Sequence, residues 1–61
     1  MSKKLWNKEK KFIYDECIEN ISKHMDNTDS FTAFDGSTAL AVAFDLDKEE
    51  TLNDIMDFRE K

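Results

Sequence analysis

Cys17 and His24 have the widest chemical repertoire in this sequence, because a thiolate and an imidazole can each act in catalysis or bind a metal. They are the only cysteine and the only histidine among 61 residues. A tetrahedral zinc site takes four ligands, which this pair does not provide. The acidic residues beside Cys17 oppose the electropositive setting that a nucleophilic cysteine needs. We therefore expect a structural Cys17, no zinc site and no enzyme activity.

Calcium and phosphate-binding motifs are also absent from the sequence. An EF-hand loop requires glycine at its sixth position and glutamate at its twelfth. A loop starting at Asp45 would place Glu50 and Met56 there. A glycine-rich phosphate loop is excluded because Gly36 is the only glycine. The sequence thus predicts no catalytic residue, no metal and no cofactor.

Surface binding is the function that the remaining residues favour. The second half of the chain carries a series of carboxylates: Asp45, Asp47, Glu49, Glu50, Asp54 and Asp57. Such a series can imitate nucleic-acid phosphates in a basic groove, although helix capping and a solvated helix face explain the same residues. Trp6 is a second candidate, since tryptophan is enriched among binding hot spots. The alternative for Trp6 is that it covers the core.

The net charge of −5 limits the class of partner. Residues 1–12 contain five lysines and one glutamate, whereas residues 13–61 contain four basic and thirteen acidic side chains. An acidic surface of this kind repels nucleic acid and anionic membranes and attracts cationic surfaces. We expect a protein partner with a basic surface, and no direct contact with nucleic acid or membrane.

The expected cellular compartment and the overall composition also agree with a small binding protein. No apolar run approaches the length of about 18 residues that a membrane span needs, and no apolar signal segment follows the lysine-rich start. We expect a cytoplasmic protein with Cys17 reduced. In its size, acidity and usage of lysine, asparagine and isoleucine, the chain is similar to accessory proteins of phages and mobile elements. That similarity implies inhibition of a host protein by occlusion of a basic surface, and it assigns no residue a role.

The length predicts one small interaction domain spanning residues 1–61. A chain of this size buries only about 60% of its unfolded surface on folding, so its core is marginal. A single cysteine leaves no intramolecular disulfide to compensate. Self-association is therefore expected, and a structural or regulatory homodimer without a foreign partner is the alternative to a host-binding module.

A long N-terminal helix is the clearest predicted element. Ile13, Cys17, Ile21 and Met25 recur every four residues, which is the pattern of a helix with one buried side. The pattern predicts a helix over residues 3–25 with Ser2 as its N-cap. The polar residues 26–30 then favour a turn.

Residues 31–44 favour a β-hairpin. Asp35-Gly36 is a turn dipeptide in which both positions tolerate a positive φ. Large side chains alternate with alanines after it, so Leu40, Val42 and Phe44 would share one face of a strand. A rival interpretation is a helix that begins near Ser37 and runs to residue 58, because alanine is the best helix former.

A short C-terminal helix over residues 48–59 completes the expected fold. Asp47 and Glu50 have the spacing of a capping box, and Leu52, Ile55 and Met56 form an apolar stripe. The expected fold class is therefore α+β with the order α-β-β-α. The rival is an all-α helical hairpin.

Overall fold

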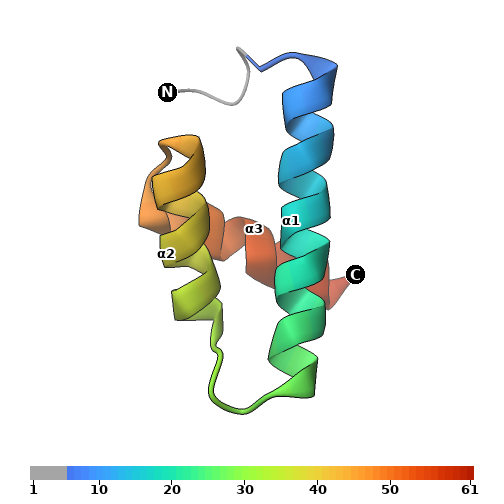
Figure 1. Ribbon diagram of the computed structural model, residues 1–61, viewed down its shortest axis with the longest axis vertical. Coiled ribbons are helices and arrows are strands. Elements are labelled where there is room, and N and C mark those ends of the chain that lie inside the picture. Colours follow the sequence, from blue (N-terminus) through green and yellow to red (C-terminus); the bar gives the residue numbers. More distant parts are fainter. Residues whose placement is uncertain (1–5) are drawn as a thin grey trace.

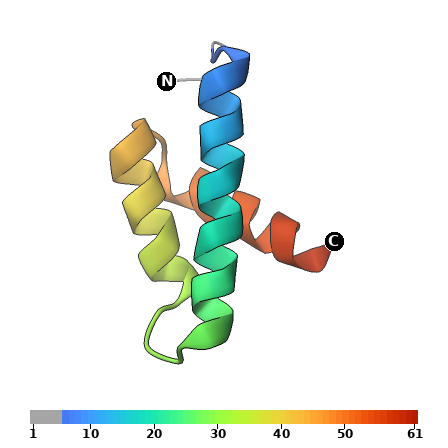
Figure 2. The same ribbon diagram turned by 45° about the vertical axis from the view of Figure 1, so that its right-hand side comes forward.

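The computed structural model describes residues 6–61, and these residues form three helices with no β-strand (Figure 1). The helices are α1 (Lys8–Asn27), α2 (Ala33–Phe44) and α3 (Lys48–Glu60). α1 and α2 lie side by side and run in opposite directions, while α3 crosses behind both (Figures 1 and 2). The fold is helical, so the expected α+β class is wrong.

The predicted hairpin is wrong because its first half contains a helix start. The Thr32 N–H donates to Asp35 Oδ2 at 2.9 Å, and the Asp35 N–H donates to Thr32 Oγ1 at 3.4 Å. This reciprocal capping box fixes the first turn of α2. Gly36 does not have a positive φ, so the predicted turn at Asp35-Gly36 does not exist. The alanines that were assigned to a strand continue the helix.

The rival single helix to residue 58 is also wrong, because the backbone reverses at Asp45. This residue has φ 56° and ψ 52°, the left-handed conformation that ends many helices. The Leu46 N–H donates to the Ala41 carbonyl at 3.0 Å and closes the last turn of α2. α3 then begins at Lys48 and crosses behind α2 instead of extending it (Figure 1).

The ends of α1 and α3 differ from their predictions in detail. α1 begins at Lys8, because the Asn7 side chain accepts the Lys10 N–H at 2.8 Å as the N-cap. The predicted cap, Ser2, lies outside the described residues. α3 confirms the predicted C-terminal helix, and Asp47 occupies the predicted N-cap position. The Asp47 side chain makes no capping hydrogen bond, so the predicted capping box with Glu50 is wrong.

The core is small and lies where the three helices meet. Its buried hydrophobic side chains come from all three helices: Tyr14, Ile18, Leu40 and Ile55. Cys17 is a free, partly buried residue packed against them, in agreement with the expected structural role. Val42 is 80% exposed, because residues 40 and 42 point to different sides of a helix although they would share one face of a strand.

Close approach of the helices depends on small residues of α2. A Cβ atom added at Gly36 would lie 2.5 Å from Ile21 Cγ2 of α1 and 3.4 Å from Ile55 Cδ1 of α3. Beside it, the buried Thr51 hydroxyl of α3 donates to the Ser37 carbonyl at 2.9 Å. Gly36 is therefore needed for the space it leaves, rather than for a turn.

Candidate protein-binding surface

The hydroxyl group of Tyr14 links α1 to α3 beside the acidic series. Tyr14 is 1% exposed, and its hydroxyl donates to Asp54 Oδ2 at 2.5 Å. Burial is the main reason that the pKa of Tyr14 is raised far above its usual range, and the hydrogen bond to Asp54 and the negative charges of Asp54, Glu50 and Asp15 add to it. Tyr14 therefore stays a neutral donor, and Asp54 has a structural function.

A groove of about 400 Å³ lies beside this hydrogen bond, between α1 and α3. Apolar atoms of Ile18 and Phe58 line it together with three carboxylates and two lysines. The complete lining is Lys11, Tyr14, Asp15, Ile18, Asp54, Asp57, Phe58 and Lys61. Lys11 forms a 2.8 Å ion pair with Asp15, but both side chains are more than half exposed, so the pair contributes little energy. The groove therefore combines apolar contacts with a charged lining in which carboxylates outnumber lysines.

The outward face of α3 continues the acidic character of this groove. Glu49, Asp57 and Glu60 are all exposed, and their spacing along the helix places them on one side. Within residues 6–61, no basic side chain forms an ion pair with any of these three. Glu60 was not among the predicted site residues, although its spacing of three from Asp57 is the signal that identifies it.

Arg59 leaves this face acidic because it points towards α1. Its Nη1 donates to the Ser22 carbonyl at 3.0 Å, and its Nη2 donates to Asp26 Oδ1 at 2.7 Å. The ion pair with Asp26 fastens the last turn of α3 to the last turn of α1. The one arginine of α3 is therefore used for structure and does not neutralise Glu49, Asp57 or Glu60.

The predicted acidic series is divided among three environments. Asp45 and Asp47 lie at the turn between α2 and α3, as the left-handed C-cap and the N-cap. Asp54 and Asp57 line the groove against α1, and Glu50 is near enough to Tyr14 to affect its pKa. The remaining member is the exposed Glu49. The structure thus gathers part of the series around one groove and places two members at the turn.

Trp6 packs against the core at the end where α1 begins. Its ring centroid lies 5.1 Å from that of Tyr14 and 5.5 Å from that of Phe44, and Lys10 Nζ lies 4.7 Å from its ring. Its indole Nε1 is buried and finds no hydrogen-bond partner in the described part of the chain. Of the two alternatives considered, this arrangement corresponds to covering the core.

Two exposed apolar surfaces were missed by the sequence analysis. Phe12, 65% exposed, lines a second groove beside Trp6 at the start of α1. On α2, Phe34 is 62% and Val42 80% exposed. The spacing of eight residues between Phe34 and Val42 is a helical signal, but it has no meaning in the hairpin that was expected.

Neither a metal-binding cluster nor a membrane-spanning helix is present in residues 6–61, and comparison with known proteins finds no match. Among the residues that the structure describes, no group of three histidine, cysteine or acidic side chains could hold a metal ion. None of the helices in residues 6–61 has the length and apolar content needed to cross a bilayer. Comparison with known proteins finds no matching family model, no matching curated protein and no matching solved structure.

Proposed function

We propose that this chain is a small protein-binding module that engages a basic surface of a partner protein through α3 and the α1–α3 groove. The observation that carries the proposal is the juxtaposition of an unneutralised acidic helix face with a groove that is both apolar and anionic. The proposal places the module in the cytoplasm and assigns it binding instead of catalysis.

The chemistry of the groove suits lysine or arginine side chains of a partner. The aliphatic stem of such a side chain would pack on Ile18 and Phe58, while its cationic end would meet Asp57. The outward carboxylates Glu49 and Glu60 would attract the surrounding basic surface over a longer distance. A bound module would also cover the partner surface beneath it, so the proposal includes inhibition by occlusion.

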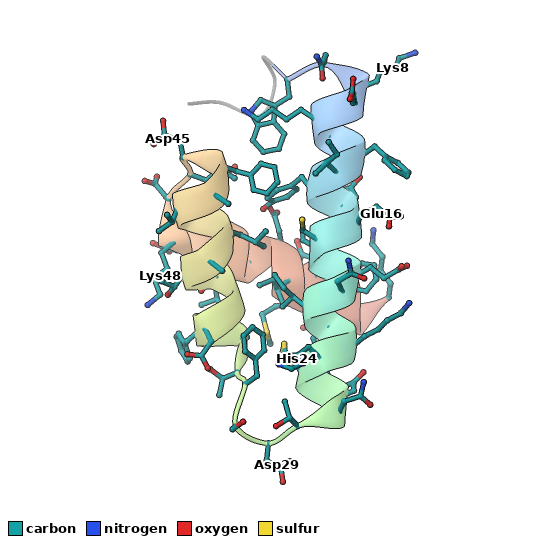
Figure 3. All side chains as sticks on the ribbon, in the orientation of Figure 1. Lys8, Glu16, His24, Asp29, Asp45 and Lys48 are labelled. Atoms are coloured by element: carbon teal, nitrogen blue, oxygen red, sulfur yellow. The ribbon has the colours of Figure 1, made fainter. Side chains whose placement is uncertain are left out.

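The experiment compares two double charge reversals. Asp57→Lys with Glu60→Lys changes the proposed surface near the C-terminal end of α3, where cations suit the helix dipole. Glu16→Lys with Asp29→Lys changes two exposed sites elsewhere, labelled in Figure 3, and is the matched control. Each substitution changes the net charge by +2, so both double variants have a net charge of −1 instead of −5. Asp54 is left unchanged because it accepts the Tyr14 hydrogen bond.

Immobilised wild-type protein is used to capture a partner from a lysate, and the affinity of the purified partner is then measured at low and high salt. We expect the α3 variant to lose at least about tenfold in affinity at low salt, and less at high salt, because charge attraction becomes repulsion and salt screens both. The control variant should bind as the wild type does. Undiminished binding by a folded α3 variant would contradict the proposal.

A further inference from the structure

The outward face of α2 is an exposed helix face with almost no charge. Between Asp35 and Asp45 the helix contains no ionisable side chain. Asp35 is already engaged in the capping box with Thr32. The exposed residues of this face are Phe34, Asp35, Thr38, Ala39, Val42 and Ala43. In a chain whose residues are 38% charged, this face is the exception.

We propose that two copies of this chain associate through this α2 face, with the two α2 helices antiparallel about a two-fold axis near Thr38. Two proteins that each carry a charge of −5 repel one another, so self-association requires a contact surface that excludes acidic side chains. The α2 face comes closest to that requirement, because its one acidic side chain, Asp35, is held in the capping box, whereas the outward face of α3 carries several carboxylates.

The charges at the ends of α2 favour the antiparallel orientation. Lys48 Nζ lies 5.9 Å from the ring centroid of Phe34, at the N-terminal end of α2, and Asp45 caps the opposite end. Figure 3 labels both residues beside α2. Residues 34 and 45 lie at opposite ends of α2, eleven residues or about three turns apart. An antiparallel pair therefore brings Lys48 of each copy towards Asp45 of the other, and it also pairs opposite helix dipoles.

The side chains of the face suit a close but limited contact. Ala39 and Ala43 are small, so they allow the two backbones to approach, and Val42 projects from the centre of the face. A 12-residue helix is about 18 Å long, so the contact is smaller than a standard stable interface. The expected dimer is thus a weak one that forms as concentration rises.

Sedimentation equilibrium from about 10 μM to about 1 mM tests the association, since a contact below standard size gives weak affinity. We expect the apparent mass to rise from the monomer value of 7.2 kDa towards twice that value. Val42→Lys should raise the dimer dissociation constant at least about tenfold, because it places two cations in an apolar contact. Asn20→Lys, an equal change of charge at an exposed site of α1, should have no such effect. A wild-type protein that stays monomeric throughout would overturn the proposal.

Cysteine cross-linking tests the orientation independently of Val42. In a Cys17→Ala background, Thr38→Cys places a thiol next to the two-fold axis, so oxidation should give a covalent dimer. Phe34→Cys lies on the same side of α2 as Thr38 but about one turn closer to the N-terminus, and in an antiparallel pair its two copies are about 12 Å apart along the helices. Equal cross-linking at both positions would indicate parallel helices and overturn the arrangement. The salt dependence of binding distinguishes this dimer contact from the proposed partner site on α3. High salt weakens binding of the partner to α3, whereas an apolar dimer persists.

Discussion

Gly36→Ala is expected to destabilise the protein although it places the best helix former inside a helix. Propensity alone would raise the free energy of unfolding by about 1 kcal/mol. The new Cβ, however, would lie 2.5 Å from Ile21 Cγ2, far inside normal contact distance. This methyl group is attached directly to the Cβ of a β-branched residue, whose χ1 angle is nearly fixed in a helix. The clash therefore requires α1 and α2 to separate or Ile21 to adopt a poor rotamer.

Overpacking of this kind costs about 1–3 kcal/mol, so we expect the free energy of unfolding to fall by about 1 kcal/mol after the gain in propensity. Urea denaturation followed by helical circular dichroism measures the change. The matched control is Asn53→Ala against Asn53→Gly at an exposed site of α3, which reports the propensity difference without a clash. Ile21→Leu removes the Cγ2 methyl group, so adding it to Gly36→Ala should recover part of the lost stability. Gly36→Ala could instead stabilise the protein by as much as the stability difference between Asn53→Ala and Asn53→Gly. That result would show that α1 and α2 do not approach each other closely at Gly36.

Two further predictions concern pH. Because the pKa of Tyr14 is raised in the folded state, the stability that its neutral hydroxyl provides is complete below the unfolded pKa of about 10 and is lost at higher pH. Tyr14 is the only tyrosine, so its phenolate absorbance should appear together with the loss of helical circular dichroism; titration near pH 10 with the helices intact would contradict this. The N–H and hydroxyl groups of Thr32 lower the pKa of Asp35, so the capping contribution is present above about pH 4 and lost as pH falls through the lowered pKa. Asp35→Asn should abolish this part of the acid dependence in urea titrations between about pH 2 and about pH 5, and an unchanged profile would mean that the carboxylate does not cap α2.

Local sequence patterns determined the elements in which hydrophobic spacing and polar turns agree. Cys17, Ile21 and Met25 do face the core from α1, and the polar residues after Asn27 do form the turn. Ile13, the first residue of the predicted stripe, is instead 47% exposed. The position of α3 was predictable because Asp47 and the apolar residues after it mark the start of a helix. Of the predicted apolar stripe, Ile55 is buried, whereas Met56 is 44% exposed.

The segment 31–44 was misassigned because two local signals compete there. Asp35-Gly36 resembles a hairpin turn, and alternation with alanine resembles a strand. The spacing of Thr32 and Asp35 is that of a capping box, which is also visible in the sequence. The helix accommodates both residues. Asp35 completes the capping box with Thr32, and Gly36 is the position where Ile21 and Ile55 approach α2.

The candidate surface was predictable in its charge but not in its arrangement. Composition alone indicates an acidic surface, and the basic partner expected from it stays a prediction. Only the tertiary structure decided that Asp54 accepts a hydrogen bond from Tyr14, forty residues earlier, and that Arg59 points towards α1. The same packing places Trp6 over the core and leaves Val42 exposed. The physical reason is that helix periodicity fixes which residues share a side of one helix. Which helix packs against that side depends on how the helices cross.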